Sequence, residues 1–252
     1  MMRPFMLGLG GMLVAGWLAL AGPTGAWADN VDMMGQIFHQ DIPAEELAAI
    51  RAAFPEGSGL NPDFIAAANN PNLHFYQQAT ATFTFLGEGA GFKNTVGYFL
   101  FDDNGNILDM RTIFSNASGT GPGLAGGGQL NVGDSVVLGV FDAGTNLGFW
   151  LRADGYNNSK GKVYYTLEGL NPDQKRHYAL WMDNANQRAV YGVEDLWNLG
   201  DKDYNDLLYS VSADPYSAIN PGAAAPEPAS LLLVVSGLAG LAGAGWRVRR
   251  RR

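Results

Sequence analysis

Hydrophobic and polar residues alternate with a period of two over much of the middle of the chain. The alternation is clearest at residues 79–85, where threonines separate alanines and phenylalanines. Such a pattern of β-branched and aromatic residues is typical of a β-strand buried on one face. Similar segments follow at residues 96–101, 107–114, 135–141, 147–153, 162–167, 177–183, 189–193 and 207–212. These roughly nine short strands predict an all-β domain at residues 74–213, an antiparallel β-sandwich or jelly roll.

Turn residues separate the predicted strands. Asp-Asp-Asn-Gly at residues 102–105 predicts a hairpin, and Gly-Thr-Asn at residues 144–146 joins another pair of strands. The glycine-rich stretch 119–128 is predicted to be a loop. It is not a phosphate-binding loop, because no Lys-Ser/Thr pair follows it.

A different pattern precedes the strands, at residues 29–73. Residues 43–54 begin with proline, carry acids in the first turn and place Leu47, Ile50 and Phe54 at helical spacing. Asn61 is placed to cap a second short helix that runs to Ala68. This segment is therefore predicted to be a short helical or irregular lead-in to the sandwich.

The N-terminus has the three parts of a secretory signal peptide. Arg3 precedes an apolar stretch at residues 5–21, and Ala26 and Ala28 form an Ala-x-Ala cleavage site. We expect cleavage after Ala28, so that residues 1–28 are removed. Four glycines within the apolar stretch disfavour the alternative, an uncleaved membrane anchor.

The C-terminus contains a second hydrophobic segment. After a Pro/Ala-rich linker at residues 214–225, Pro226, Glu227 and Pro228 precede an uncharged stretch at residues 229–245 and a terminal arginine cluster. As a transmembrane helix the uncharged stretch would span roughly 25 Å, enough to cross a bilayer, with the arginines on the cytoplasmic side.

This order of features at residues 226–252 resembles the PEP-CTERM sorting signal of Gram-negative bacteria. The resemblance implies an exosortase-type enzyme as partner, which recognises the tail and removes it. It also implies an inner-membrane-anchored intermediate, delivery to the cell surface or medium, and a host that makes exopolysaccharide. An ordinary single-span anchor predicts the same orientation but does not account for Pro226, Glu227 and Pro228.

Composition excludes several kinds of site. The chain has no cysteine, which rules out thiol catalysis and Cys-ligated zinc, and its three histidines are scattered. Residues 29–225 contain 10 Lys and Arg against 23 Asp and Glu, a net charge of −13. That charge argues against nucleic-acid binding and favours divalent cations.

The densest polar segment is residues 194–206, with five carboxylates and two asparagines in 13 residues. Because such crowded acids repel one another, a bound Ca²⁺ is the predicted cofactor; Asx-turns that only shape the loop are the alternative. The predicted ligands are Glu194, Asp195, Asp201, Asp203, Asn205 and Asp206. In an extended loop Asp201, Asp203 and Asn205 would point the same way, which resembles the first half of an EF-hand loop. Asp206 and Ser212 stand where that loop needs glycine and glutamate.

Glu194-Asp195 and the run Gly-Asp-Lys-Asp-Tyr-Asn-Asp-Leu at residues 200–207 resemble the closing signature of the DUF4114 domain. Residues 97–105 and 148–151 also fit that family, so the resemblance covers about residues 75–213. It implies a β-rich extracellular module of unknown function, whose acids have prompted suggestions of enzymatic activity. The family's glycine pair is reduced here to Gly200 alone. His177 falls where the family often has a histidine-led strand, and we interpret it as a structural residue with a satisfied ring.

Two weaker candidate sites remain. Asp102, Asp103 and Asp109 would form a second cation site near the hairpin, but turn chemistry accounts for the first two. A sugar-stacking platform would use the aromatic residues of the strands and loops, although such residues usually pack in the core. They are Trp150, Tyr156, Tyr164, Tyr165, Trp181, Tyr191 and Trp197.

The sequence favours a noncatalytic, calcium-stabilised surface or matrix protein that associates with exopolysaccharide. A carbohydrate-binding module is the alternative. A hydrolase that uses two of Glu194, Asp195, Asp203 and Asp206 fits less well. Paired catalytic carboxyls stand about 5–10 Å apart in a cleft, whereas adjacent carboxylates of one loop are expected to lie closer together and to be better metal ligands. No nucleophile motif such as Gly-x-Ser-x-Gly is present.

Overall fold

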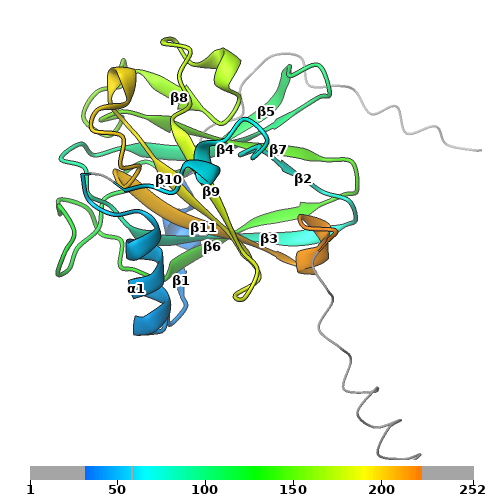
Figure 1. Cartoon of the computed structure of the whole chain (residues 1–252), viewed down its shortest axis with the longest axis horizontal. Helices are drawn as coiled ribbons and strands as arrows, with labels where there is room; N and C mark the ends of the chain where they lie inside the picture. Colours follow the sequence, from blue (N-terminus) through cyan, green and yellow to red (C-terminus); the bar gives the residue numbers. More distant parts are fainter. Residues whose placement is uncertain (1–31, 58, 223–252) are drawn as a thin grey trace, which may run out of the picture.

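The computed structural model describes residues 32–57 and 59–222 (Figure 1). The predicted signal peptide with Ala26 and Ala28, and the predicted sorting signal with Pro226, Glu227 and Pro228, lie outside these residues. Within the described part, no helix has the length and apolar character needed to cross a membrane.

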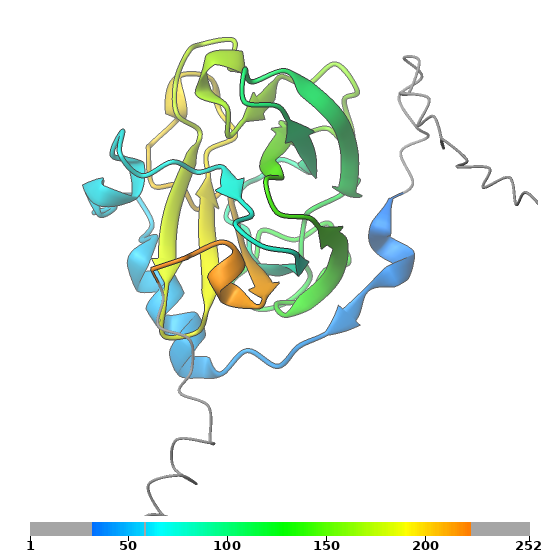
Figure 2. The ribbon, with the colours of Figure 1, turned by 90° about the vertical axis from the view of Figure 1, so that its right-hand side faces the viewer.

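Two antiparallel sheets face each other in a β-sandwich (Figures 1 and 2). The six-stranded sheet has the order β1-β6-β3-β11-β10-β9, and the five-stranded sheet has the order β2-β7-β4-β5, with β8 paired to β7. Every ladder between these strands is antiparallel. The strands are β1 (Phe38–His39), β2 (Leu73–His74), β3 (Ala79–Gly87), β4 (Thr95–Phe101), β5 (Ile107–Phe114), β6 (Asp134–Phe141), β7 (Asn146–Arg152), β8 (Val163–Tyr165), β9 (Tyr178–Asp183), β10 (Arg188–Val193) and β11 (Leu207–Asp214).

The predicted antiparallel all-β architecture is confirmed. Each of the nine predicted segments overlaps one of the strands β3 to β11. The sequence missed β1 and β2, which are two-residue strands at the margins of the sheets and too short to show any alternation.

Aromatic rings from both sheets form the centre of the core. Tyr209 on β11 stacks on Phe83 of β3 and on Tyr191 of β10, with ring centroids 4.5 and 4.9 Å apart. Phe149 of β7 approaches Tyr209 from the opposite sheet at 5.4 Å. These cross-strand contacts explain why the aromatic positions of the period-two pattern are buried.

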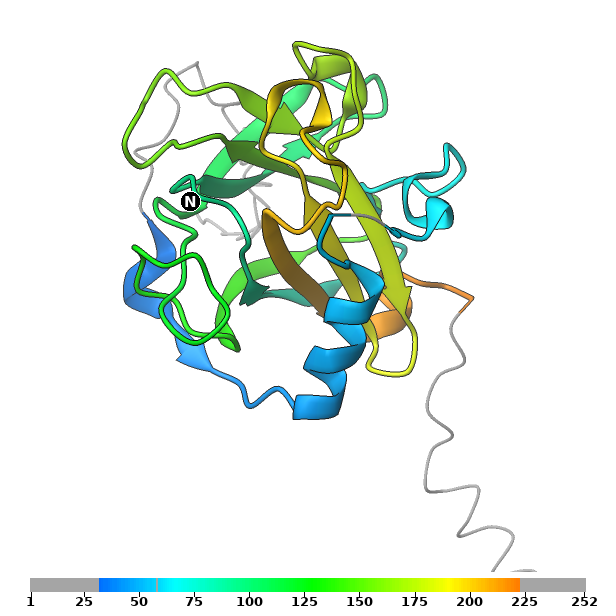
Figure 3. The same cartoon turned by 60° about the vertical axis from the view of Figure 1, so that its left-hand side comes forward.

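The helical part of the lead-in lies across the outer face of the six-stranded sheet (Figure 3), whereas β1 forms an edge strand of that sheet. Helix α1 (Ala44–Ala53) confirms the helix predicted at residues 43–54 and buries Ile50, with Phe54 directly after it. The second predicted helix is wrong in extent. Asn61 does cap the turn by accepting a hydrogen bond from Asp63 N at 3.0 Å, but only the 3-10 turn η2 (Pro62–Ile65) forms, since Ala66 is already extended.

Four more 3-10 turns complete the elements of the described chain. They are η1 (Met33–Gln36), η3 (Glu168–Leu170), η4 (Trp197–Leu199) and η5 (Tyr216–Ala218). The last turn lies in the predicted linker, and its Tyr216 and Ala218 are buried against the sandwich core.

We expect Gly97→Ala to lower the free energy of unfolding by about 1–3 kcal/mol or more, because it overpacks the centre of the five-stranded sheet. The Trp150 indole lies across Gly97 and donates a hydrogen bond to Arg111 O at 3.2 Å, so a Cβ would meet both the ring and that oxygen. Urea unfolding measures the change. Gly35→Ala is the control, because nothing lies within 4 Å of its Cβ position. Equal unfolding midpoints for the two variants would contradict the expectation.

Candidate metal site

The acidic segment forms the loop between β10 and β11, and it is bent rather than extended. Asn198, Leu199, Lys202 and Tyr204 all have positive φ, between 58° and 71°. The loop is therefore not extended as expected, although the side chains of Asp201 and Asp203 do converge. Backbone reversals, not strand-like alternation, orient the carboxylates.

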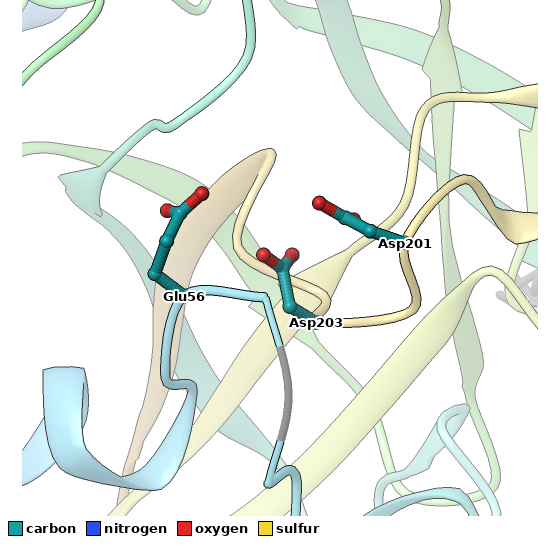
Figure 4. Close-up of side chains that lie close together, drawn as sticks. All are labelled: Glu56, Asp201 and Asp203. Atoms are coloured by element: carbon teal, nitrogen blue, oxygen red, sulfur yellow. The ribbon is translucent and has the colours of Figure 1, made fainter.

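Three carboxylates converge on one side of this loop. Glu56, Asp201 and Asp203 each place a carboxylate oxygen within 4.8 Å of the others, and Figure 4 shows the three groups turned toward a common space. We name these three residues the carboxylate triad. Glu56 comes from the lead-in, just after α1, so the sequence prediction of ligands within residues 194–206 missed it. The sequence Pro-Glu-Gly at residues 55–57 predicts only the end of the preceding helix.

Hydrogen bonds connect the lead-in, which carries Glu56, to the acidic loop, which carries Asp201 and Asp203. Asp203 Oδ2 accepts a hydrogen bond from Gly57 N at 2.8 Å. Asn205 Nδ2 donates to Glu56 Oε2 at 3.0 Å and to Asp203 Oδ2 at 3.1 Å. The amide nitrogen of Asn205, rather than its oxygen, thus faces these carboxylates.

Glu194 lies on the buried side of the same loop and is fully inaccessible to solvent. Its Oε1 accepts a hydrogen bond from Tyr204 N at 3.0 Å, whereas Oε2 has no hydrogen-bond partner among the described residues. Burial raises the pKa of Glu194 to about 7, and the nearby charges of Asp201 and Asp203 raise it further, against the backbone N–H groups of Tyr204 and Asp203, which lower it. An unpaired buried carboxylate beside other acids is a group that a cation would stabilise.

Asp195 and Asp206 form a separate pair. Asp206 Oδ2 accepts a hydrogen bond from Asp195 N at 2.8 Å, and Asp195 Oδ2 accepts one from Asn94 Nδ2 at 2.7 Å. Burial, followed by the charge of Asp195, raises the pKa of Asp206 to about 8. Of the six predicted ligands, Asp201 and Asp203 therefore belong to the triad and Asp195 and Asp206 to this pair, whereas Glu194 and Asn205 belong to neither group.

His177 contacts the acidic loop, and both of its ring nitrogens have hydrogen-bond partners, as predicted. Its Nδ1 donates to Glu194 O at 2.7 Å and its Nε2 to Asp173 Oδ2 at 3.0 Å. Tyr164 stacks on the ring at 3.6 Å between centroids. Asp173, which the sequence gave no reason to select, also accepts a hydrogen bond from Asn198 N at 2.9 Å. Asp173 and His177 thus link the acidic loop to the β8–β9 connection.

The hairpin acids make local contacts, as the turn interpretation predicts. Asp102 Oδ1 accepts hydrogen bonds from Asn104 N at 2.9 Å and from Asn106 N at 2.8 Å. Asp109 forms an ion pair with Arg111 at 2.8 Å. These contacts account for Asp102 and Asp109 without a second cation.

The aromatic residues of the predicted platform are scattered. Trp150, Tyr164 and Tyr191 are core residues. Tyr156 and Trp197 are 57 % and 47 % exposed, and a lysine nitrogen lies over each ring, from Lys93 and Lys162 respectively. Tyr165 and Trp181 are half-buried, so only Tyr156 and Trp197 of the seven rings are largely exposed.

The acidic loop and the strands around it can be compared with known families. Residues 141–214 match DUF4114, a domain of unknown function. No curated protein and no solved structure matches the chain. The DUF4114 match contains the whole acidic loop and β7 to β11. It begins at residue 141, whereas the predicted resemblance begins at about residue 75. Glu56 and Asn94 lie outside the match.

Proposed function

We propose that this chain is an exported, noncatalytic cell-surface or matrix protein whose DUF4114 region binds Ca²⁺ beside the carboxylate triad. The unpartnered, fully buried Oε2 of Glu194 carries the calcium part of the proposal. A buried carboxylate oxygen without a donor is strongly unfavourable unless it is neutralised or coordinated.

The donor set fits a hard cation. Glu56, Asp201 and Asp203 would supply carboxylate oxygens, and water and backbone carbonyls would complete the about six to eight ligands that Ca²⁺ takes. No cysteine is present in the sequence, and His177 donates from both nitrogens, so a site for a softer metal is disfavoured. Millimolar extracellular Ca²⁺ would occupy even a weak site of this kind.

A noncatalytic role is supported by how the loop acids are used. Glu194, Asp195 and Asp203 are each at most 3 % exposed, so a polymeric substrate has no access to their carboxyl groups. Asp203 and Asp195 are also engaged by amide donors of the protein itself. Such acids are better suited to holding an ion than to transferring a proton to a glycosidic oxygen.

Export and attachment rest on the two predicted sorting segments. The signal peptide would release Asp29 as the first residue, and an exosortase-type enzyme would process the chain at Pro226-Glu227-Pro228. The acidic surface left after processing suits a calcium-rich, polysaccharide-containing exterior, where the protein would be a structural component.

Calorimetry tests the calcium part directly. With Ca²⁺ at about 100 times its dissociation constant, the free energy of unfolding should rise by about 2.7 kcal/mol relative to EDTA, which raises Tm by about 5–10 °C. Mg²⁺ at the same concentration should raise Tm less, because it demands a compact octahedral site and keeps its water. An identical Tm in Ca²⁺ and EDTA, with no heat of binding, would refute the proposal.

A further inference from the structure

We infer that a cavity beside helix α1 binds a single neutral pyranose ring, such as a terminal sugar of an extracellular polysaccharide. The cavity has a volume of about 210 Å³ and lies between α1, the end of β3, the glycine-rich loop at residues 119–128 and the β10–β11 loop. We name it the α1 cavity. The inference rests on the proposed place of the chain in a polysaccharide-containing exterior, and it gives that association a site.

Part of the lining of the α1 cavity is apolar. Four segments that are far apart in the sequence each contribute one side chain: Phe54 directly after α1, Leu86 of β3, Leu124 of the glycine-rich loop and Leu208 of β11. Apolar lining of this kind suits the C–H face of a sugar ring, whereas a hydrated ion gains nothing from it. The apolar part therefore favours a small organic ligand.

Polar side chains in the same lining keep hydrogen-bonding capacity that the protein does not use. Arg51 is an exposed residue of α1, and within residues 32–57 and 59–222 its guanidinium forms no ion pair. Asn205 donates through Nδ2 to Glu56 Oε2, which leaves Asn205 Oδ1 and Glu56 Oε1 as acceptors. A sugar hydroxyl both donates and accepts, so neighbouring hydroxyls would satisfy the guanidinium and these oxygens together.

The glycine-rich loop is held in place as one wall of the α1 cavity. The carboxylate of Glu88 accepts hydrogen bonds of 3.1–3.3 Å from the backbone N–H groups of residues 119, 125 and 126. Arg51 Nη2 lies 3.9 Å from the position that a Cβ on Gly123 would take, so the guanidinium reaches from α1 to this loop. A cavity whose walls are already fixed loses less conformational entropy when a ligand binds.

Charge favours a neutral sugar over an acidic one. Within the described chain, Arg51 is the only cationic residue that lines the α1 cavity, whereas Glu56 and Glu88 are both acidic. Asp203 adds a further carboxylate close to Glu56. A uronic acid would therefore meet net negative charge, and a neutral pyranose would not.

Amide chemical shifts of the isotope-labelled full chain test the inference in the wild-type protein. The probes are the methyl glycosides of glucose, galactose and mannose, titrated to about 50 mM, which populates a complex with a millimolar dissociation constant. At least one of them should shift the amides of residues 51–57, 86–89 and 123–126 together. If none of the three shifts these amides, the inference is overturned, and no variant is needed to reach that result.

Arg51→Gln should weaken binding of the same glycoside about tenfold or more, because hydrogen bonds from a charged donor are lost. Arg111→Gln is the matched control, since it removes an exposed arginine of β5 that does not line the α1 cavity. It should bind like the wild type. Equal affinities of all three proteins would contradict the inference, and so would tighter binding of the methyl glycoside of glucuronic acid.

The outcomes separate this inference from the proposed function. If Ca²⁺ raises Tm but no neutral glycoside shifts the amides around the α1 cavity, only the inference fails. If a glycoside binds there with the expected loss in Arg51→Gln, while Ca²⁺ neither binds nor stabilises the protein, the inference stands and the calcium part of the proposed function fails.

Discussion

Replacing Asp173 with asparagine is expected to lower the free energy of unfolding by about 3–5 kcal/mol, because it breaks a buried ion pair. The side chains of Asp173 and His177 are 1 % and 0 % exposed, and their oxygen and nitrogen lie 3.0 Å apart. Nδ1 of His177 donates to the carbonyl oxygen of Glu194, and Nε2 faces the carboxylate of Asp173. The variant replaces that carboxylate by a neutral amide and removes its contact with the buried ring. Urea unfolding at pH 7 measures the loss.

The effect should depend on pH in a defined direction. Burial raises the pKa of Asp173, but hydrogen bonds from Asn198 N, His177 and Lys175 N outweigh it, so the folded-state pKa is lowered. A lowered carboxyl pKa adds stability above its unfolded value of about 3.8, and that stability is lost as pH falls through the folded pKa. The gap between wild type and Asp173→Asn should therefore be full near neutral pH and should close in acid.

Asp109→Asn is the matched control, because it breaks an Asp ion pair that is largely exposed. The Asp109 and Arg111 side chains are 35 % and 57 % exposed, and such pairs contribute at most about 1 kcal/mol. If the two Asp→Asn variants lose the same amount of stability, the Asp173–His177 pair is not the support for the acidic loop that the geometry indicates.

The effect of Glu194→Gln on the free energy of unfolding should reverse its sign when Ca²⁺ is added. In EDTA near pH 8 the variant should be more stable than wild type by about 2 kcal/mol, because it removes a buried negative charge whose Oε2 has no partner. In saturating Ca²⁺ it should be less stable by about 2–3 kcal/mol, because a negative charge beside the bound ion is lost. Thermal unfolding of both proteins in both conditions gives the four values needed.

Glu88→Gln controls for burying a glutamine in place of a glutamate. Glu88 is also buried, but its carboxylate accepts hydrogen bonds from Gly119, Ala125 and Gly126 N–H groups and has no part in the triad. Its effect should be the same in Ca²⁺ and in EDTA. A Glu194→Gln variant that behaves like Glu88→Gln, with no reversal, would remove the main support for a cation beside Glu194.

The strands of the sandwich could be predicted because their signal is local. The threonine-phenylalanine alternation of β3 and the Asp-Asp-Asn-Gly turn between β4 and β5 are properties of neighbouring residues. Sheet formation then follows from burying one face of each strand. The crowding of acids at residues 194–206 is likewise visible in the sequence, and so is the need to neutralise it. The two sorting segments stay predictions from the sequence alone.

The partners of those acids were decided only by the tertiary structure. Glu56 reaches Asp203 across 147 positions of the chain, and Asp173 meets Asn198 N across 25 positions. Whether a carboxylate is paired, shared or left without a donor depends on which distant backbone N–H or side chain the fold brings to it. Composition fixed the amount of negative charge in this protein, but burial and long-range packing determined which oxygens converge and which one, Glu194 Oε2, has no partner within the described chain.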